Sequence, residues 1–409
     1  MSEWKRYKLS DIASLSNGIN FDKSAYTSGV KLIGVADFKD RIYPDYNSLQ
    51  EVDSKVVRKG DYLERGDIVF VRSNGNKELV GRCMMIDQDV PVTYSGFCIK
   101  LRLIDKNIFE PIFFNYLFRT RQFRKAMTGT AVGANIQNLS QSRLGNCEVR
   151  VPNIEEQREI ATILSRYDLL IENYQKQIKL LEEVAQRLYK EWFVDLHFPS
   201  HENTKIVDGV PEGWVKKKLE DIFSYVRGRS YTSKELSDSG TILVNLKNIQ
   251  AFGGYKRDAE KRYLGDYKQE QSLEVGDLIM GVTDMTQERR LVGHVALIPE
   301  FKEPATFSMD LIKILPFELS KSFLYCAMRF GGISKQIAPL ANGVNVLHLK
   351  PEAMMGIEMM VPSKELIKHF DDYYNHGFNT ILHLQDQIRL LTEARDRLLP
   401  KLMSGEIAV

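Results

Sequence analysis

The sequence repeats itself at an interval of 210 residues, and this repeat restricts the folds that the chain can adopt. Trp4 and Trp214 are separated by that interval, in the segments "SEWKRYKLSDIA" and "VPEGWVKKKLEDIF". The same spacing joins four further pairs: Leu9 and Leu219, Asp11 and Asp221, Ile12 and Ile222, Gly18 and Gly228. A chain that starts again in its middle is expected to build the same unit twice.

The repeat continues along the chain. "YLERGDIVF" at 62–70 returns as "SLEVGDLIM" at 272–280, and "VGANIQNLS" at 132–140 returns as "NGVNVLHLK" at 342–350. Only two copies exist, and the period is much longer than that of a solenoid repeat. The sequence therefore predicts a tandem duplication of one unit.

Each copy ends in a long helix with a coiled-coil pattern. Apolar residues recur in alternating steps of four and three at Ile160, Leu164, Tyr167, Ile171, Tyr174, Ile178, Leu181, Ala185, Leu188 and Trp192. The second copy repeats this seam, with a glycine and an arginine as departures, at Phe370, Tyr374, Gly377, Ile381, Leu384, Ile388, Leu391, Arg395, Leu398 and Leu402. Two sustained heptad stripes in one chain pair most simply with each other. The alternative is two amphipathic core helices of separate domains.

The ends of the two helices carry recognisable signals. Asn153 and Ser363 are N-cap candidates, each followed by acidic residues. Gly405 suits a C-cap, and Pro400 is expected to end or kink the second helix just before its last turn. Antiparallel pairing would hold two globular segments at opposite ends of a rod roughly 60 Å long, a dumbbell with pseudo-two-fold symmetry.

The globular segments are predicted to mix helices and strands, so the fold class is α+β. Short runs rich in branched residues predict strands at 31–36, 67–72, 82–86 and 97–103, and in the second copy at 241–246, 277–282, 294–298 and 311–315. Packed helices are expected at 111–127 and 322–337. The repeated pairs Gly66–Asp67 and Gly276–Asp277 are interpreted as turns into strands.

The repeat and the helices together predict the domain boundaries. These are a globular domain at 1–152, a helix at 153–198, a linker at 199–210, a second globular domain at 211–361, and a helix with its tail at 362–409.

Composition narrows the class of protein. With 409 residues and 43% hydrophobic content, the chain can bury more than one core. Apolar runs are too short to span a membrane and the N-terminus is too polar for a secretory signal, so the cytoplasm is the expected location. Cysteine spacing predicts neither a metal site nor a disulfide framework. The net charge of +2 permits nucleic-acid binding only if basic residues cluster or other subunits supply charge.

The sequence lacks most signatures of catalysis. It has no phosphate-binding loop, no dinucleotide-binding glycine motif, no zinc-protease motif and no amino-methyltransferase motif. One loose pattern suits a metal-dependent nuclease, in which Asp45 and Asp53 would hold a cation beside Lys55. The second copy lacks these acids at matching positions, which favours a solvated loop over the nuclease.

Polar loops beside the predicted strands supply groups that suit DNA. Arginine and lysine can bind guanine edges or phosphates, and asparagine and glutamine can bind adenine. The candidates in the first copy are Lys39, Arg41, Arg72, Ser73, Asn74, Asn76, Lys77, Asn135 and Gln137. Those in the second copy are Asn245, Lys247, Asn248, Gln250, Lys256, Thr283, Thr286, Gln287, Arg289, Arg290, Asn345 and His348. The alternative is ordinary solvated hairpins, but matching positions with different contents favour two readers of different base sequences.

Taken together, these segments resemble the specificity subunit of type I restriction-modification systems over the whole chain. "VPEGWVKKKLEDI" resembles the opening of that family's target-recognition domain, and "NLKNIQAFGGYK" and "GANIQNLS" resemble stretches within it. "VPNIEEQREIATIL" resembles the start of the family's spacer helix, and "RLLPKLMSGEI" its C-terminal close. The segment "VPSKELIKHF" departs from the pattern because it lacks the Glu-Glu-Gln of the first copy.

The resemblance implies a non-catalytic DNA-specificity subunit. Residues 1–152 and 211–361 would be target-recognition domains, each reading one half of a split site in double-stranded DNA. The helices would set the spacing and dock two modification (methyltransferase) subunits, and restriction subunits (ATP-dependent translocase and nuclease) would be further partners. S-adenosylmethionine would bind the modification subunits, and this chain would bind no cofactor and no metal. The alternatives are the stand-alone nuclease described above and a coiled-coil scaffold that does not bind DNA.

Overall fold

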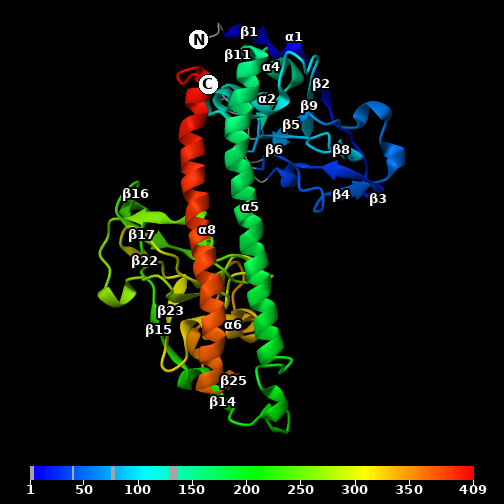
Figure 1. Cartoon of the computed structure of the whole chain (residues 1–409). Helices are drawn as coiled ribbons and strands as arrows, with labels where there is room; N and C mark the ends of the chain where they lie inside the picture. Colours follow the sequence, from blue (N-terminus) through cyan, green and yellow to red (C-terminus); the bar gives the residue numbers. More distant parts are fainter. Residues whose placement is uncertain (1–3, 39–40, 75–78, 129–136) are drawn as a thin grey trace. The chain divides into compact units, whose positions relative to one another are not determined.

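The computed structural model describes residues 4–38, 41–74, 79–128 and 137–409. The chain divides into two compact units. Unit 1 comprises Met1–Asn173 and Ile388–Val409, and unit 2 comprises Tyr174–Gln387. Two long helices, α5 (Ile154–Phe193) and α8 (Lys364–Ser404), run from one unit into the other (Figure 1). Each unit therefore contains a part of both helices.

Unit 1 is built around a four-stranded antiparallel sheet. In spatial order its strands are β2 (Ala13–Asn17), β9 (Cys98–Leu103), β5 (Ile68–Val71) and β7 (Cys83–Met85). Side chains of β5 alternate between two hydrophobic cores, as the two-residue period of a strand requires. Ile68 and Phe70 join one core, and Val69 and Val71 join the other. Burial on both faces explains why the sequence of this strand is a continuous apolar run.

The other elements of unit 1 surround this sheet. A second sheet has the order β4 (Gln50–Val52), β3 (Tyr26–Ile33), β8 (Val92–Tyr94), with β8 parallel to β3. Two short antiparallel pairs are β1 (Lys5–Lys8) with β11 (Glu148–Val151), and β6 (Ser73–Asn74) with β10 (Gln137–Asn138). The shorter helices are α1 (Leu9–Ile12), α2 (Pro111–Arg119), α3 (Arg121–Thr128) and α4 (Gln141–Gly145).

Unit 2 has a four-stranded sheet in the same order of matching strands. These strands are β15 (Phe223–Arg227), β23 (Leu311–Pro316), β19 (Leu278–Gly281) and β21 (Val295–Leu297). The second sheet contains β16 (Leu236–Ser237), β18 (Lys261–Tyr263), β17 (Thr241–Val244) and β22 (Ala305–Phe307), with β17 and β22 parallel. Short antiparallel pairs are β12 (Ile206–Val207) with β13 (Val210–Pro211), β14 (Val215–Lys218) with β25 (Glu358–Val361), and β20 (Thr283–Asp284) with β24 (Leu347–His348). The shorter helices are α6 (Lys321–Arg329) and α7 (Ile333–Ile337).

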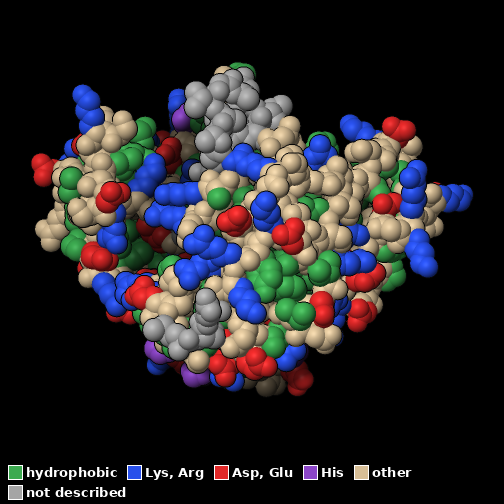
Figure 2. All heavy atoms as spheres, turned by 90° about the horizontal axis from the view of Figure 1, so that it is seen from above, with side chains coloured by type: hydrophobic (Ala, Val, Ile, Leu, Met, Phe, Trp, Pro, Cys, Tyr) green, Lys and Arg blue, Asp and Glu red, His purple; other side chains and the backbone are tan. Residues whose placement is uncertain are grey.

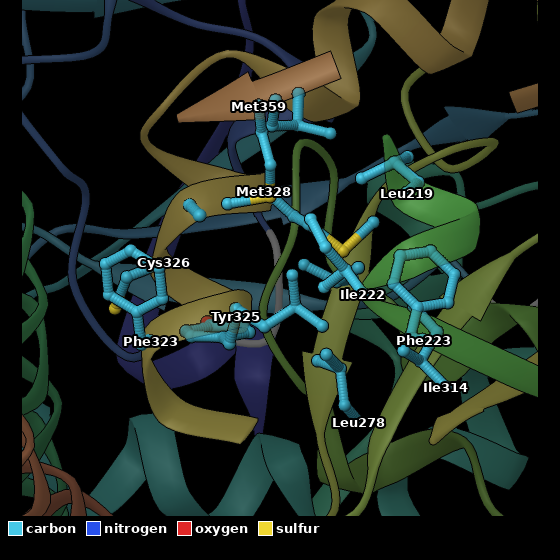
Figure 3. Packing of buried hydrophobic residues seen from close by; sticks show 14 of the residues in the cluster. Leu219, Ile222, Phe223, Leu278, Ile314, Phe323, Tyr325, Cys326, Met328 and Met359 are labelled. Carbon is cyan, nitrogen blue, oxygen red and sulfur yellow. The ribbon is translucent and has the colours of Figure 1, made fainter. Parts of the chain in front are cut away.

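The main core of unit 2 lies between its sheet and α6. Figure 3 shows Leu278 and Ile314 from neighbouring strands, with Phe223 beside them and Phe323 on the helix. All four side chains are fully buried. Each such side chain contributes about 1.5–3 kcal/mol through its removal from water, so this core holds the sheet and the helix together.

The predicted strands are present, although their bounds shift by a few residues. The two predicted helices at 111–127 and 322–337 are each divided into two. In unit 1 Thr120 has an extended backbone, and its hydroxyl accepts a hydrogen bond from the N–H of Phe123 near the start of α3. In unit 2 the division falls at Gly332, whose φ of 84° belongs to the left-handed region.

The two repeated Gly-Asp turns are confirmed as structural features. Gly66 has a φ of 91°, and Asp67 is fully buried just before β5. The carboxylate of Asp67 accepts two hydrogen bonds of 2.7 Å from the guanidinium of Arg102. In unit 2 the carboxylate of the buried Asp277 accepts a hydrogen bond of 2.6 Å from the ammonium group of Lys321. These contacts account for the repeated pair without any ligand.

The N-cap predictions for the long helices are confirmed. Asn153 Oδ1 accepts a hydrogen bond from the N–H of Glu156 at 2.9 Å, and Ser363 Oγ accepts one from Leu366 at 3.3 Å. The glycine predicted as the C-cap, Gly405, follows α8 with a φ of 72°. These local signals thus mark where both helices begin and where the second one ends.

Pro400 was expected to end or kink α8, and it does not end the helix, because α8 continues to Ser404. Leu402 and Met403, in the last turn, are buried in the core of unit 1. Their burial offsets the hydrogen bond that the proline ring cannot donate.

The long helices run in opposite directions within each unit. In unit 1 the first part of α5 lies beside the last part of α8, since Arg395 Nη1 is 2.5 Å from Asp168 Oδ1 and Leu402 shares a core with Ile160. In unit 2 the last part of α5 lies beside the first part of α8, where Trp192 and Phe370 meet edge to face.

The predicted seam residues face the protein rather than the solvent. Ile160, Leu164, Ile171 and Ile381 are buried, and the half-buried members are Ile178, Leu181, Leu188, Leu384, Ile388, Leu391 and Leu398. Within the described residues, no helix has both the length and the apolar character needed to cross a membrane. The four cysteines are free thiols, and three of them are buried.

Candidate nucleic-acid interface

Two predicted loops of unit 1 lie side by side. Ser73 pairs with Asn138 and Asn74 pairs with Gln137 through β6 and β10, and the N–H of Leu139 donates to the carbonyl of Arg72 at 2.8 Å. Leu139 is fully buried, so it anchors the second segment against the core. Residues 72–74 and 137–139 therefore lie side by side.

The same arrangement occurs in unit 2. Thr283 pairs with His348 through β20 and β24, and the side-chain amide of Gln287 donates to the carbonyl of Val344 at 3.0 Å. Gln287, Asn345 and His348 are exposed, so three predicted recognition side chains share one surface.

Asp284 fixes the loop that carries Gln287, although the sequence analysis did not select it. Its carboxylate accepts hydrogen bonds from the backbone and hydroxyl of Thr286 at 2.8 Å and from the N–H of Leu291 at 2.6 Å. Burial raises the pKa of Asp284, but these hydrogen bonds outweigh it and hold the pKa below its usual value. The signal in the sequence was the order Asp-x-Thr, which is typical of a side-chain-capped turn.

A third loop, residues 245–256, joins this surface in unit 2. Phe252 donates its N–H to the carbonyl of Arg290 at 2.8 Å, which brings the tip of the loop against the segment 283–290. Asn245 and Asn248 lie inside the loop and are buried. The amide of Asn245 donates to Asn248 Oδ1 at 3.1 Å, and the amide of Asn248 donates to the carbonyl of Lys256 at 2.9 Å.

The corresponding loop of unit 1 has a similar turn with different contents. Asp37 accepts a hydrogen bond from the N–H of Gly34 at 2.8 Å, as Asn248 does from Asn245 in unit 2. Arg41, four residues beyond Asp37, is exposed and forms an ion pair of 2.9 Å with Asp45. The two units thus present matching loops whose side chains differ.

The predicted DNA-binding residues differ in exposure. The exposed side chains belong to Arg41, Lys247, Gln250, Lys256, Gln287, Arg290, Asn345 and His348. The half-buried ones are Arg72, Ser73, Thr286 and Arg289, and the buried ones are Asn245, Asn248 and Thr283. Lys39, Asn76, Lys77 and Asn135 lie outside the described residues, and only the backbone of Asn74 and Gln137 is described.

The residues of the nuclease alternative have separate local roles. Asp45 is paired with Arg41. Asp53 Oδ1 accepts a hydrogen bond of 2.9 Å from the N–H of Lys55 and so caps the short 3₁₀ helix Ser54–Val56. Across the residues that the structure describes, no cluster of three or more His, Cys, Asp or Glu side chains is arranged to hold a metal ion.

Charge on the surface is mixed. On the face shown in Figure 2, lysine and arginine side chains form small groups with aspartate and glutamate between them.

Comparisons with known proteins show which proteins this chain is similar to. Residues 1–183 match the family model described as "Type I restriction modification DNA specificity domain". The chain is 29% identical, over 72% of its length and 68% of the relative's, to the specificity subunit of the type I restriction enzyme MjaIX of Methanocaldococcus jannaschii. It is 23% identical, over the full length of both chains, to the specificity subunit of the type I enzyme HindI of Haemophilus influenzae.

A solved structure has the same fold. It is the S subunit of a type I restriction-modification system from M. genitalium, with a TM-score of 0.62 and 17% identity, covering 98% of this chain and 96% of that one. The chain is thus similar to type I specificity subunits, and its residues 1–183 match the model of the DNA specificity domain. Specificity subunits are the non-catalytic DNA-recognition components of type I restriction systems and work together with other subunits.

Proposed function

We propose that this chain is the DNA-specificity subunit of a type I restriction-modification complex, and that each unit reads one half of a bipartite double-stranded site. The proposal rests on one observation above all. In both units the segment after the central strand, β5 or β19, pairs with a segment some 60 residues further along the chain, through β6–β10 and β20–β24. A tandem duplication that kept this pairing and changed its side chains supplies two equivalent readers of different bases.

The proposed base-reading groups of unit 2 are exposed side chains of the paired loops: Gln287, Arg290, Asn345 and His348. In unit 1 the proposed groups include Arg72, which is half-buried beside the paired segments, and Arg41, which is exposed on a separate loop. Glutamine, asparagine and arginine form the bidentate contacts that distinguish bases in the major groove. Asn245, Asn248 and Thr283 are buried, and they are proposed to affect DNA binding indirectly, by holding the loops in shape.

The paired helices are proposed to set the distance between the two half-sites as an antiparallel coiled coil. Their opposite directions within each unit and the burial along the seam support this part of the proposal. Two modification subunits, which would carry S-adenosylmethionine, are proposed to dock on the helices, with restriction subunits as further partners. Exposed apolar side chains on α5 offer a surface for protein partners: Leu169, Leu170, Leu180 and Val184.

Substitutions in the two units test the assignment of readers. Arg72→Ala is expected to weaken binding to one half-site by about 1–3 kcal/mol, and Arg290→Ala is expected to do the same at the other half-site. Selection of bound duplexes from a random library, with the chain and its modification subunits, measures base preference at every position. Each variant serves as the control for the other. Equal loss of preference at both half-sites in either variant would contradict the two-reader model.

The spacing role has a separate test. A heptad inserted after Ile178 and another after Ile388 keep the seam in register and lengthen each helix by roughly 10 Å. The preferred gap should then widen by at most about three base pairs, since the duplex rises about 3.4 Å per base pair. Four-residue insertions at the same places rotate the seam and should cost stability first. A folded, active complex with seven-residue insertions and an unchanged gap would refute the spacing role.

A further inference from the structure

Phe252, at the tip of the loop 245–256 in unit 2, has an unusual environment for a large apolar residue. Its φ is 66°, in the left-handed region that bulky residues rarely adopt, and its side chain is 58% exposed. Such a backbone is strained, and it persists only where the surrounding structure imposes it. Residues held in this way often mark a site of action.

Hydrogen bonds on either side hold the tip in place. The N–H of Phe252 donates to the Arg290 carbonyl at 2.8 Å, and the N–H of Gly254 donates to the Val295 carbonyl at 2.8 Å. The ring meets the ring of His294 edge to face, with 5.5 Å between centroids and an angle of 88°. The ring therefore stands on the surface in a defined orientation instead of folding into the core.

The loop rests on a half-buried arginine, Arg329. Gly253 and Gly254 have φ values of 103° and 106°. A Cβ on Gly253 would lie 3.1 Å from Arg329 Cγ, and one on Gly254 would lie 3.3 Å from Arg329 Nη2. Arg329 itself is held by Tyr325 Oη at 2.5 Å and by Glu182 of α5 at 3.3 Å. This support makes the tip a rigid projection.

The loop that carries the ring also lines an open hollow. The hollow has a volume of about 680 Å³, and its lining includes Lys247, Lys256 and Lys261, the amide of Gln250 and the carboxyl group of Glu260, beside apolar residues. A protein partner would need a contiguous apolar patch around the ring. An exposed aromatic ring on a loop that also carries lysines instead suits a nucleic acid, whose bases stack on aromatic faces and whose phosphates bind lysine.

We propose that Phe252 is a DNA wedge: its ring inserts against one base step of the half-site read by unit 2, while the lysine-lined hollow holds the adjacent phosphates. This inference rests on the proposed function of unit 2 as a DNA reader. Partial unstacking by an apolar side chain kinks the duplex, and flexible pyrimidine–purine steps make that kink least costly. Phe252 is then a specificity-determining residue that selects the step by its deformability.

Unit 1 supplies an internal comparison. Phe252 stands four residues beyond Asn248, and the residue four beyond the matching Asp37 is Arg41. An arginine at this place can bind a base edge or a phosphate but cannot act as an apolar wedge. The wedge is therefore expected in one half-site only.

The experiment uses the complex of the full chain with its modification subunits, without S-adenosylmethionine, on the preferred duplex obtained by selection. 2-Aminopurine is placed at each position of both half-sites in turn, and its fluorescence is measured with and without the complex. A rise of several fold is expected at one step of the unit 2 half-site. Phe252→Ala should abolish that rise and weaken binding roughly ten-fold. Phe252→Tyr, which keeps the aromatic ring, should retain both.

Three outcomes separate the possible roles. A fluorescence rise that survives in Phe252→Ala belongs to a base flipped by a modification subunit. If this is the sole rise, and no other position shows a rise that depends on Phe252, the wedge is overturned. Unchanged DNA affinity in Phe252→Ala also overturns it, and so does weakened assembly with modification subunits at unchanged DNA affinity. If Arg290→Ala still changes base preference in that half-site, the proposed function stands and only the wedge fails. If Arg290→Ala leaves base preference unchanged too, the proposed function of unit 2 fails.

Discussion

Replacing Arg395 of α8 by alanine is expected to destabilise unit 1 more than any exposed charge on the same helix. Arg395 occupies a seam position where the heptad pattern calls for an apolar residue. Its Nη1 donates to Asp168 Oδ1 at 2.5 Å, and the Tyr116 hydroxyl donates to Asp168 Oδ2 at 2.5 Å. Burial lowers the pKa of Arg395, but the charges of Asp168 and Asp396 and the hydrogen bonds to both carboxylates together raise this pKa above its usual value.

The magnitude follows from burial. The side chains of Arg395 and Asp168 are 22% and 17% exposed, so solvent screens the pair only in part. Breaking a fully buried pair costs about 3–5 kcal/mol, and an exposed pair contributes about 0–1 kcal/mol. For this intermediate case we expect Arg395→Ala to cost about 2 kcal/mol, because it leaves Asp168 charged beside only the Tyr116 hydroxyl. That loss corresponds to a fall in melting temperature of about 4–8 °C for a unit of this size.

Guanidinium titration of the full chain, followed by circular dichroism, measures the effect. Arg389→Ala is the matched control, since Arg389 lies on the same helix and pairs with Glu393 at 2.9 Å across a more exposed surface. Its cost should stay within about 0.5 kcal/mol. A double-mutant cycle with Asp168→Asn should give a coupling energy of about 1–2 kcal/mol. Equal losses in Arg395→Ala and Arg389→Ala, or no coupling, would refute the reasoning.

Two further predictions concern unit 2. Gly228→Ala is expected to lower the free energy of unfolding by about 2–3 kcal/mol, because a Cβ would lie 2.0 Å from the Ser308 carbonyl oxygen. Gly60→Ala, where a Cβ meets nothing within 4 Å, is the control in the same urea titrations, and equal losses would contradict the argument. Burial lowers the pKa of His294 from 6.5, although Asp284 opposes the shift, so the unfolded chain binds this proton more readily than the folded one. The contribution of His294 to the free energy of unfolding should therefore be fully present above about pH 6.5 and be lost below it. Urea titrations between pH 5 and 8 should show that the free energy of unfolding of His294→Gln changes less steeply with pH than that of the unchanged chain. An equal slope in both proteins would refute this.

The features that depend on side-chain spacing along the chain could be predicted without coordinates. The heptad stripe predicts the two long helices, and the N-caps Asn153 and Ser363 lie within three residues of the groups they bind. The apolar run before Arg72 predicts β5, because a strand that is buried on both faces has consecutive apolar residues instead of alternating apolar and polar ones. Much of the order of helices and strands is therefore encoded by residues that are close together in the sequence.

The candidate site was only partly predictable. The loops were found by their polar content, but that content does not say which side chains point outward. Asn245 and Asn248 were predicted to bind DNA, but in the structure their side-chain amides form hydrogen bonds within the loop. The amide of Asn245 donates to Asn248, and the amide of Asn248 donates to the loop backbone. Asp284 was missed, and Phe252 drew no notice, because exposure and a left-handed backbone are properties of a folded loop.

The sequence by itself determined the repeat, the long helices with their caps, and the strands, because these follow from periodicities and contacts a few residues apart. Tertiary structure decided that the segment after β5 meets β10, that Arg395 finds Asp168, and that α8 continues through Pro400. Each of these depends on groups far apart in the chain, or on a core that offsets a locally unfavourable residue. Burial of non-local side chains supplies that free energy, and no local pattern encodes it.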